Sequence, residues 1–225
     1  YAVADTGWTG SMQRSLGQLL SSVSGQKTKI TGFYFGMYSP PKSDEYGEYI
    51  NWYFSDISSM GIKIKFNNNL FECMCSADHG MTLGYKSENG KAVPVLGKVS
   101  ETNRRLAVHQ IECACLFAEN ISYDIRNINE EMLHETTRRL LQRIMYCPEK
   151  SEAEALGQFE FCDDVSECYM MKLAEPLTEE QLSDCLVSEK LKCRLEHKHN
   201  DSELFWNYGT AAVSDVQNKN WYRFN

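Results

Sequence analysis

One stretch near the start of the 225-residue chain decides which fold the sequence predicts. It reads Val3-Ala4-Asp5-Thr6-Gly7-Trp8-Thr9-Gly10-Ser11-Met12-Gln13. The apolar residues 1–5 predict a short buried strand that ends in an acid, and the two glycines that follow predict a turn. Over residues 11–23, apolar side chains recur at helical spacing and predict a helix. A strand, a glycine-rich turn and a helix in this order are typical of α/β proteins.

The turn between the predicted strand and helix has the composition of an anion-binding site. The first N–H groups of a helix lack intrahelical acceptors and lie at the positive end of the helix dipole, so they suit a phosphate or carboxylate. Asp5 lies at the carboxyl end of the strand, where open α/β sheets bind ligands, and is expected to hold a ligand hydroxyl or a Mg²⁺ ion. The residues expected to bind the ligand from this turn are Thr6, Gly7, Trp8, Thr9, Gly10, Ser11 and Gln13.

The same turn also fits a purely structural role. In that interpretation Ser11 caps the helix, the glycines make the connection tight, and Trp8 packs in the core instead of stacking on a ligand. The two interpretations differ at Gly10. If this glycine lets a ligand approach the backbone, a bulky residue there is expected to block binding and to leave the helix formed.

Three known phosphate-binding motifs resemble the turn without matching it. The Rossmann fingerprint needs three glycines as G-x-G-x-x-G, and a P-loop needs a lysine that this turn lacks. The D-x-D-x-T motif of haloacid-dehalogenase-like phosphatases keeps its nucleophile-position Asp5 and its Thr9 here, but Gly7 replaces the second acid. A divergent phosphatase with Asp5 as nucleophile, which needs Mg²⁺ and a neighbouring acid/base, is therefore an alternative to a binding site.

A second cluster of polar residues precedes a predicted hairpin. It contains Glu72, Asp78 and His79. A histidine beside an aspartate suits acid/base chemistry, because its pKa lies near neutrality. Asp78 and His79 are therefore candidate catalytic residues and Glu72 a candidate ligand-binding residue, with a solvated loop as the alternative interpretation.

The first hundred residues alternate predicted strands and helices, and the remainder is mainly helical. Strands are predicted at 30–38 and 62–66, a short aromatic helix at 48–55, a helix at 69–76, and a hairpin around Asn89-Gly90. Helices are predicted at 103–121, 129–145, 151–159 and 178–186, the first of them central to the core. The expected fold is therefore an α/β, Rossmann-like layered sheet in residues 1–100, mostly parallel with one hairpin, and a mainly helical region, 101–225, packed on it.

Composition excludes several classes of protein. With 42% hydrophobic residues, 24% charged residues and a net charge of -8, the chain is expected to be globular and to bind neither nucleic acid nor a membrane. No apolar run approaches the roughly 20 residues that a membrane helix needs. The nine cysteines are irregularly spaced and are expected to be small buried hydrophobes in a reducing cytoplasm. His197 and His199, near Cys193, form only a loose metal-site candidate.

Several stretches resemble a bacterial family. This family is the region downstream of the catalytic domain in large predicted haloacid-dehalogenase-superfamily hydrolases, often encoded among cell-surface polysaccharide genes. The stretches that carry the resemblance are the turn at residues 5–13, Gly32-Phe33-Tyr34-Phe35-Gly36, and residues 70–85 with Asp78-His79-Gly80. The resemblance implies sugar or phosphate chemistry in the cytoplasm and a haloacid-dehalogenase-like domain upstream in the same full-length chain, for which the start at Tyr1 is suggestive. Because Gly7 replaces the second acid, the resemblance does not imply that this chain has phosphatase activity.

The preferred hypothesis is a cytoplasmic domain that binds a phosphorylated small molecule, a sugar phosphate or nucleotide sugar, in polysaccharide metabolism. Enzymatic versions of the hypothesis are a phosphatase-like hydrolase and a sugar or phosphoryl transferase, with Asp78 and His79 as acid/base residues in the transferase. The non-catalytic alternative is a protein-interaction module. Its partner surface would use the aromatic residues Phe33, Tyr34, Tyr46, Tyr49, Trp52 and Tyr53.

Overall fold

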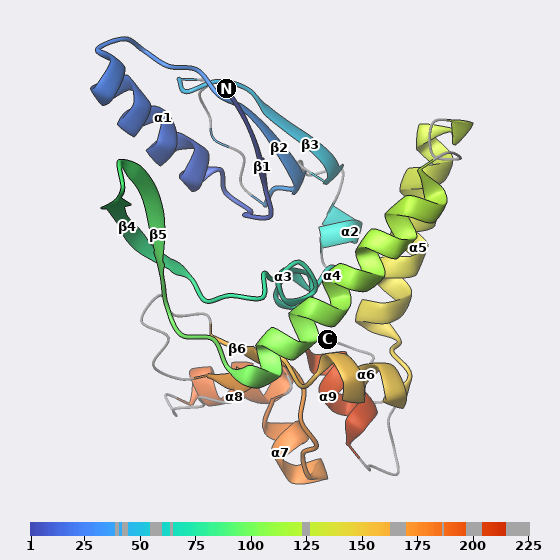
Figure 1. Ribbon diagram of the computed structural model, residues 1–225. Helices are drawn as coiled ribbons and strands as arrows, with labels where there is room; N and C mark the ends of the chain where they lie inside the picture. Colours follow the sequence, from blue (N-terminus) through green and yellow to red (C-terminus); the bar gives the residue numbers. More distant parts are fainter. Residues whose placement is uncertain are drawn as a thin grey trace. The chain divides into compact units, whose positions relative to one another are not determined.

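The computed structural model contains a parallel sheet at the N-terminus followed mainly by helices (Figure 1). The structure describes residues 1–38, 41, 45–54, 60–63, 65–122, 127–162, 170–185, 187–196 and 204–214. The chain divides into two compact units, Tyr1–Phe66 and Asn67–Asn225. The division lies near residue 66, whereas the sequence predicted a change near residue 100. The difference arises because, among the described strands, the two strands of the hairpin pair with each other and not with the N-terminal sheet.

The first unit contains β1 (Ala2–Asp5), α1 (Ser11–Ser24), β2 (Thr31–Gly36), β3 (Tyr49–Phe54) and α2 (Met60–Lys63). Its strands pair in the order β1-β2-β3, and both pairings are parallel. The sequence prediction of an α/β fold with a mostly parallel N-terminal sheet, a hairpin and later helices is confirmed at this level.

Three local predictions in this unit were wrong. Residues predicted as an aromatic helix form β3, because aromatic and β-branched residues favour strands and β2 offers a parallel partner. The alternating segment predicted as a strand at 62–66 instead begins inside the short helix α2 and forms helical-turn bonds such as Phe66 N–H to Lys63 O at 3.2 Å. β1 is half exposed rather than buried, since it pairs on one side only within the described residues.

The two faces of the parallel sheet differ. α1 lies on one face (Figure 1), where the Gln13 side chain hydrogen-bonds to the backbone beside β2 and β3. On the other face, Ala4, Phe33 and Ile50 form one row across the three strands. Phe33 is 49% exposed and Ile50 is 43% exposed. This row is an apolar surface, named the Phe33–Ile50 row below.

The second unit begins with a short helix and a hairpin. These elements are α3 (Asn68–Met74), β4 (Thr82–Glu88) and β5 (Lys91–Leu96). Longer helices follow, α4 (Glu101–Ile121) and α5 (Glu130–Tyr146), and then α6 (Lys150–Leu156), β6 (Glu160–Phe161), β7 (Met171–Lys172), α7 (Glu179–Asp184), α8 (Val187–Leu195) and α9 (Asn207–Val213).

Several turn and cap predictions in this unit are confirmed. Asn89 and Gly90 have φ angles of 52° and 76°, as a tight hairpin turn requires. The Asn129 side chain accepts a hydrogen bond from the Met132 N–H and caps α5. Thr178 opens α7 with the predicted capping box. Short polar motifs of this kind determine local geometry strongly, so they are read from sequence more reliably than burial.

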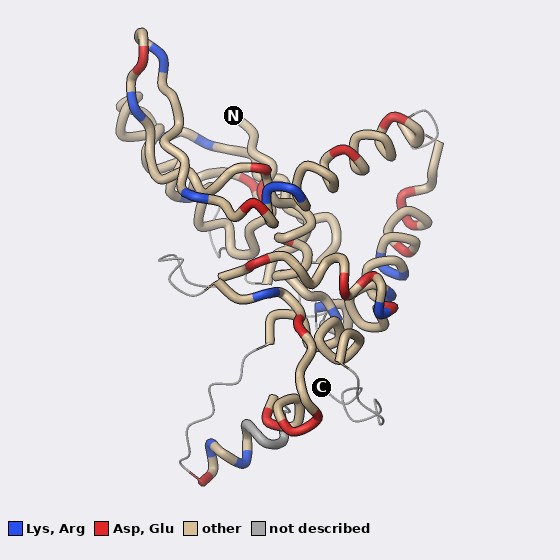
Figure 2. The backbone as a smooth tube through the Cα atoms, turned by 60° about the horizontal axis from the view of Figure 1, so that its bottom comes forward, with Lys and Arg blue, Asp and Glu red and all other residues tan. Residues whose placement is uncertain are grey.

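The predicted burial of α4 was wrong. Only Ala107 is buried in this helix, and every residue from 111 to 120 is exposed. α5 is a charged helix, and both signs of charge are visible along it in Figure 2. There Glu135 binds Arg138 and Arg139, each at 2.6 Å, and these bonds lower the pKa of Glu135 to about 2.

The cysteines are less buried than predicted. Among the described cysteines none forms a disulfide, and only Cys73 is buried. Burial raises the pKa of its thiol to about 12, so Cys73 is an inert core residue. The exposed cysteines are Cys75, Cys113, Cys115 and Cys147. None of the helices in the described ranges is long and apolar enough to cross a membrane.

Candidate anion-binding site

Asp5 ends β1 and organises the turn that follows. Its Oδ1 accepts a hydrogen bond from the Gly7 N–H at 2.8 Å. A Cβ atom at position 7 would lie 3.1 Å from both Asp5 carboxylate oxygens. The second acid of a D-x-D-x-T motif would therefore crowd the first in this conformation. Gly7 keeps the Asp5 carboxylate fixed at the carboxyl end of the sheet.

The N-terminus of α1 has no side-chain cap. Gly10 is the N-cap residue, with φ of 70°, and Ser11 is the first helical residue rather than the predicted cap. The first helical hydrogen bond runs from the Arg14 N–H to Gly10 O at 3.2 Å. The N–H groups of the first turn precede that bond and lack helical acceptors. Thr9 and Ser11 are exposed, and their hydroxyl oxygens lie 3.2 Å apart beside this turn.

Gly10 has a structural role that makes it a poor probe of ligand binding. It is buried, and a Cβ atom there would lie 2.6 Å from Tyr49 Cε1 and 3.0 Å from Met37 Cε. Its left-handed φ adds strain for any other residue. A valine at this position is expected to disturb the packing of α1 on the sheet, so Gly10→Val would not separate a lost ligand contact from a disturbed helix.

Gln13 does not face a ligand. Its side chain is fully buried at 0% exposure. Nε2 donates to Ile30 O at 2.8 Å and to Glu48 O at 3.1 Å, and Oε1 accepts from the Tyr34 hydroxyl at 3.0 Å. Both amide donors are thus used inside the protein. The assignment of Gln13 as a ligand-binding residue was wrong, because its hydrogen bonds join α1 to the sheet.

Trp8 lies in an aromatic cluster. Its ring packs against Tyr38, Phe54 and Phe66, with centroid distances of 5.7, 6.1 and 5.3 Å. Of the two interpretations left open by the sequence, the structure favours a packed tryptophan. Thr6, in contrast, is exposed beside the turn.

Two tyrosines and an arginine complete the surroundings of the turn. Burial and the nearby Asp5 charge raise the pKa of Tyr34 to about 12, so its hydroxyl is neutral at physiological pH. Burial also raises the pKa of Tyr49, and the neighbouring Arg14 guanidinium opposes this shift. Arg14 is exposed and lies one turn into α1, from where its positive charge acts on Tyr49. Sequence reasoning missed this cation, although it follows the motif directly.

A row of polar side chains crosses the sheet on the α1 face. Asp5 pairs with Tyr34 and Tyr34 with Asn51, so the three side chains point to the same side. The Asn51 Oδ1 is buried and has no hydrogen-bond partner among the described residues. The row ends at the carboxyl edge of parallel strands, where α/β proteins bind ligands.

The second predicted cluster lies in the second unit. Asp78 and His79 are exposed in the segment between α3 and β4, and His79 Nδ1 lies 2.9 Å from Gly80 O. Glu72 is half-buried on α3, and burial, with a smaller contribution from the Glu72 charge, raises the pKa values of the Cys73 and Cys75 thiols. Within the described ranges, no group of three metal-ligating side chains occurs. His197 and His199 lie outside these ranges.

Comparisons with known proteins assign neither a family nor a function to the chain. No protein-family model matches the chain, and a search of curated proteins found no relative.

Proposed function

We propose that the first unit binds a phosphorylated small molecule, a sugar phosphate or a nucleotide sugar, at the N-terminus of α1. The observation that carries the proposal is an uncapped helix start at the carboxyl edge of a parallel sheet, with exposed hydroxyls at Thr9 and Ser11. Backbone N–H groups at such a start favour anions. Thr6, at the exposed side of the turn, is the remaining hydroxyl available to the ligand.

Charge around the turn supports two subsites. The Arg14 guanidinium and the helix dipole favour a phosphate next to α1. Asp5 carries the opposite charge at the end of β1 and would repel the phosphate, so we place it on a sugar hydroxyl or a Mg²⁺ ion bound to the ligand. Carboxylate oxygens are the donors that Mg²⁺ prefers, and Asp5 is the only residue of the turn that offers them.

The proposal also covers the type of sheet in the first unit and the metabolic role of the chain. The strand order β1-β2-β3, with α1 between the first two strands, supports the proposal that this unit is part of a Rossmann-like layered sheet. The resemblance of residues 5–13 and 70–85 to the regions that follow haloacid-dehalogenase-like hydrolases supports a cytoplasmic role in polysaccharide metabolism beside such a domain. Asp78 and His79 remain the acid/base candidates of the transferase version.

Substituting Ser11 tests the phosphate site. We expect Ser11→Asp to weaken binding of glucose 1-phosphate about 10-fold or more, since a carboxylate at the helix start competes with the phosphate for the same N–H groups. Helix stability should be unchanged or slightly higher, because an acid in the first turn interacts favourably with the dipole. Calorimetric titration of the whole chain with glucose 1-phosphate, UDP-glucose and inorganic phosphate measures the effect.

Ser15→Asp is the matched control. Ser15 is an exposed serine one turn further along α1, so the same charge is added away from the free N–H groups. Binding should then be close to that of the parent chain. The proposal is contradicted if the parent binds none of the three phosphorylated probes, or if the two variants weaken binding equally.

The phosphatase alternative makes a different prediction at Asp5. Asp5→Asn keeps an acceptor for the Gly7 N–H and should leave the turn intact. If Asp5 is a nucleophile, Mg²⁺-dependent hydrolysis of an aryl phosphate is expected in the parent and should be lost in the variant. We expect no hydrolysis by either protein, because position 7 offers no second acid. Hydrolysis abolished by Asp5→Asn would favour the phosphatase.

One observation favours the interaction-module alternative. The Phe33–Ile50 row is an exposed apolar face of a parallel sheet, and such sheets are normally covered on both faces. Among the aromatic residues suggested for a partner surface, Phe33 is exposed whereas Tyr34 and Tyr53 are buried. A partner surface on this unit would therefore use the row and not the whole aromatic set.

A further inference from the structure

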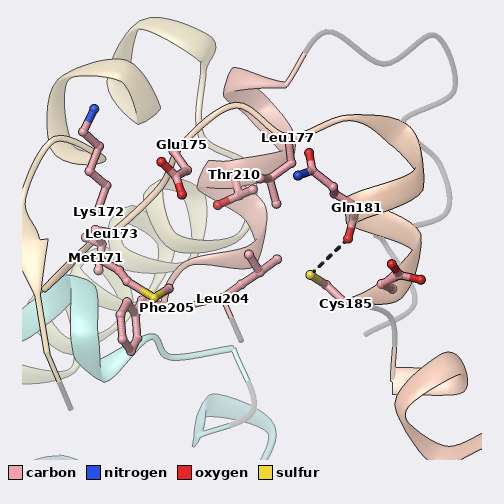
Figure 3. Close-up of a pocket in the computed structure, with 11 residues that line it drawn as sticks. Met171, Lys172, Leu173, Glu175, Leu177, Gln181, Cys185, Leu204, Phe205 and Thr210 are labelled. Carbon is pink, nitrogen blue, oxygen red and sulfur yellow. Dashed lines mark hydrogen bonds between the residues drawn. The ribbon is translucent and has the colours of Figure 1, made fainter. Parts of the chain in front are cut away.

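The second unit contains a pocket to which the sequence assigned no role. Its volume is about 340 Å³, which lies at the lower end of the range typical of small-molecule sites. The pocket is formed by β7, the segment that follows it, α7 and the start of α9 (Figure 3). It lies entirely within this unit and does not depend on the proposed function of the first unit.

Hydrogen bonds between elements hold the pocket walls in place. Leu173 N–H donates to Phe159 O at 2.7 Å and attaches the end of β7 to the segment after α6. The Leu177 N–H donates to the Ser214 Oγ at 3.0 Å, and that hydroxyl in turn donates to Thr210 O at 2.6 Å. The wall opposite β7 is thereby joined to α9. A pocket fixed in this way is largely formed before a ligand arrives, which reduces the entropy lost on binding.

One polar group that lines the pocket has no hydrogen-bond partner among the described residues. Thr210 is 1% exposed and lines the pocket. Its backbone groups bond to Trp206 and Ser214, but no described residue forms a hydrogen bond with its hydroxyl. A hydroxyl that lines a pocket and has no protein partner is available to hydrogen-bond to a ligand there.

Charge and surface chemistry define the ligand class. Figure 3 shows the Glu175 carboxylate on the same side of the pocket as the Thr210 hydroxyl, whereas the Lys172 ammonium points away. Gln181 and Asp184 add two more polar side chains, and the other lining residues are apolar or sulfur-bearing. They are Met171, Leu173, Leu177, Cys185, Leu204 and Phe205. A methionine beside an aromatic ring packs well on another aromatic group.

We propose that this pocket binds a small molecule with an aromatic body and a protonated amine. The amine donates to the Glu175 carboxylate and to the Thr210 hydroxyl, and the body packs against Met171, Leu204 and Phe205. A carboxylate ligand is disfavoured, because the described lining residues include two acids, Glu175 and Asp184, and one cation, Lys172.

A pair of probes with opposite charge tests the proposal on the full chain. Tryptamine and indole-3-propionate share the indole ring and differ at the charged end. We expect tryptamine to bind at millimolar concentration or below, and indole-3-propionate to bind at least 10-fold more weakly. Glu175→Gln should weaken tryptamine binding about 10-fold, because the amine loses its charged acceptor. Thr210→Val, which keeps the shape of the side chain, should weaken it several-fold.

Glu180→Gln is the matched control, since Glu180 is an exposed acid on α7 that does not line the pocket. It should leave tryptamine binding within about twofold of the parent. If Thr210→Val fails to fold, as judged by its thermal unfolding, the exposed Glu175→Gln decides the result. The proposal is overturned if tryptamine does not bind at millimolar concentration, if indole-3-propionate binds as tightly, or if Glu180→Gln and Glu175→Gln weaken binding equally.

Discussion

Replacing Gln13 with alanine is expected to destabilise the first unit by about 3 kcal/mol or more. The substitution removes three hydrogen bonds and leaves the Ile30 carbonyl and the Tyr34 hydroxyl without a partner in the interior. An unsatisfied buried group costs about 1–3 kcal/mol, and the lost side chain also leaves a cavity. The loss should appear as faster hydrogen exchange of the Gly32 amide, whose acceptor Glu48 O also binds Gln13.

Two variants separate the causes. Gln13→Met preserves most of the volume but not the hydrogen bonds, so it should also be strongly destabilising. Gln18→Ala removes the same side chain from an exposed position of α1 and should change stability by less than about 0.5 kcal/mol. If Gln13→Ala instead left exchange of the Gly32 amide unchanged and weakened phosphate binding, the ligand role first assigned to Gln13 would be restored.

Gln13 also shows where sequence reasoning is limited. The strand, turn and helix at residues 1–24 are predicted from the local sequence alone, because the spacing of apolar residues and the position of turn-forming glycines are signals that extend over only a few residues. The role of Gln13 depends instead on Ile30, Tyr34 and Glu48, which are distant in sequence. A polar residue beside a glycine-rich turn looks like a ligand contact until the packing of the helix is known.

The opposite error occurred for α4. Its composition predicted a core helix, but burial depends on which other elements cover the helix, and residues 111–120 are exposed. β3 was missed for a related reason, since the segment has strand-like residues but no alternating polarity, and its pairing with β2 is non-local. Caps such as Asn129 and Thr178 were predicted well because each hydrogen bond is formed within three residues.

The pocket of the second unit had almost no sequence signal. Its walls come from residues 171–185 and 204–210, and only the capping box at Thr178 was recognised there. Thr210 is an ordinary threonine in an apolar segment. Its burial and its position in the pocket are set only once α9 has packed on the neighbouring helices α5 and α6.

Replacing Trp206 with alanine is expected to destabilise the second unit by about 3–5 kcal/mol, the range measured for large aromatic residues in cores. Trp206 is the N-cap residue of α9 and is 0% exposed. Its Nε1 donates to Met145 O at 3.0 Å and so attaches the start of α9 to the end of α5. Gly209 allows the ring to lie directly on the helix, since a Cβ atom at that position would overlap it.

Trp206→Phe is the comparison that separates packing from hydrogen bonding. It keeps an aromatic ring but loses the bond to Met145 O, so it should cost about 1–3 kcal/mol, less than alanine. Urea unfolding followed by hydrogen exchange in α9 and α5 measures both variants. Because Phe205 precedes the tryptophan and lines the pocket, the alanine variant should also lose tryptamine binding under conditions where part of α9 is open. If Trp206→Ala lowers the free energy of unfolding by less than about 1 kcal/mol, α9 does not stabilise this unit strongly. The inference that hydrogen bonds to α9 hold the pocket rigid would then be contradicted.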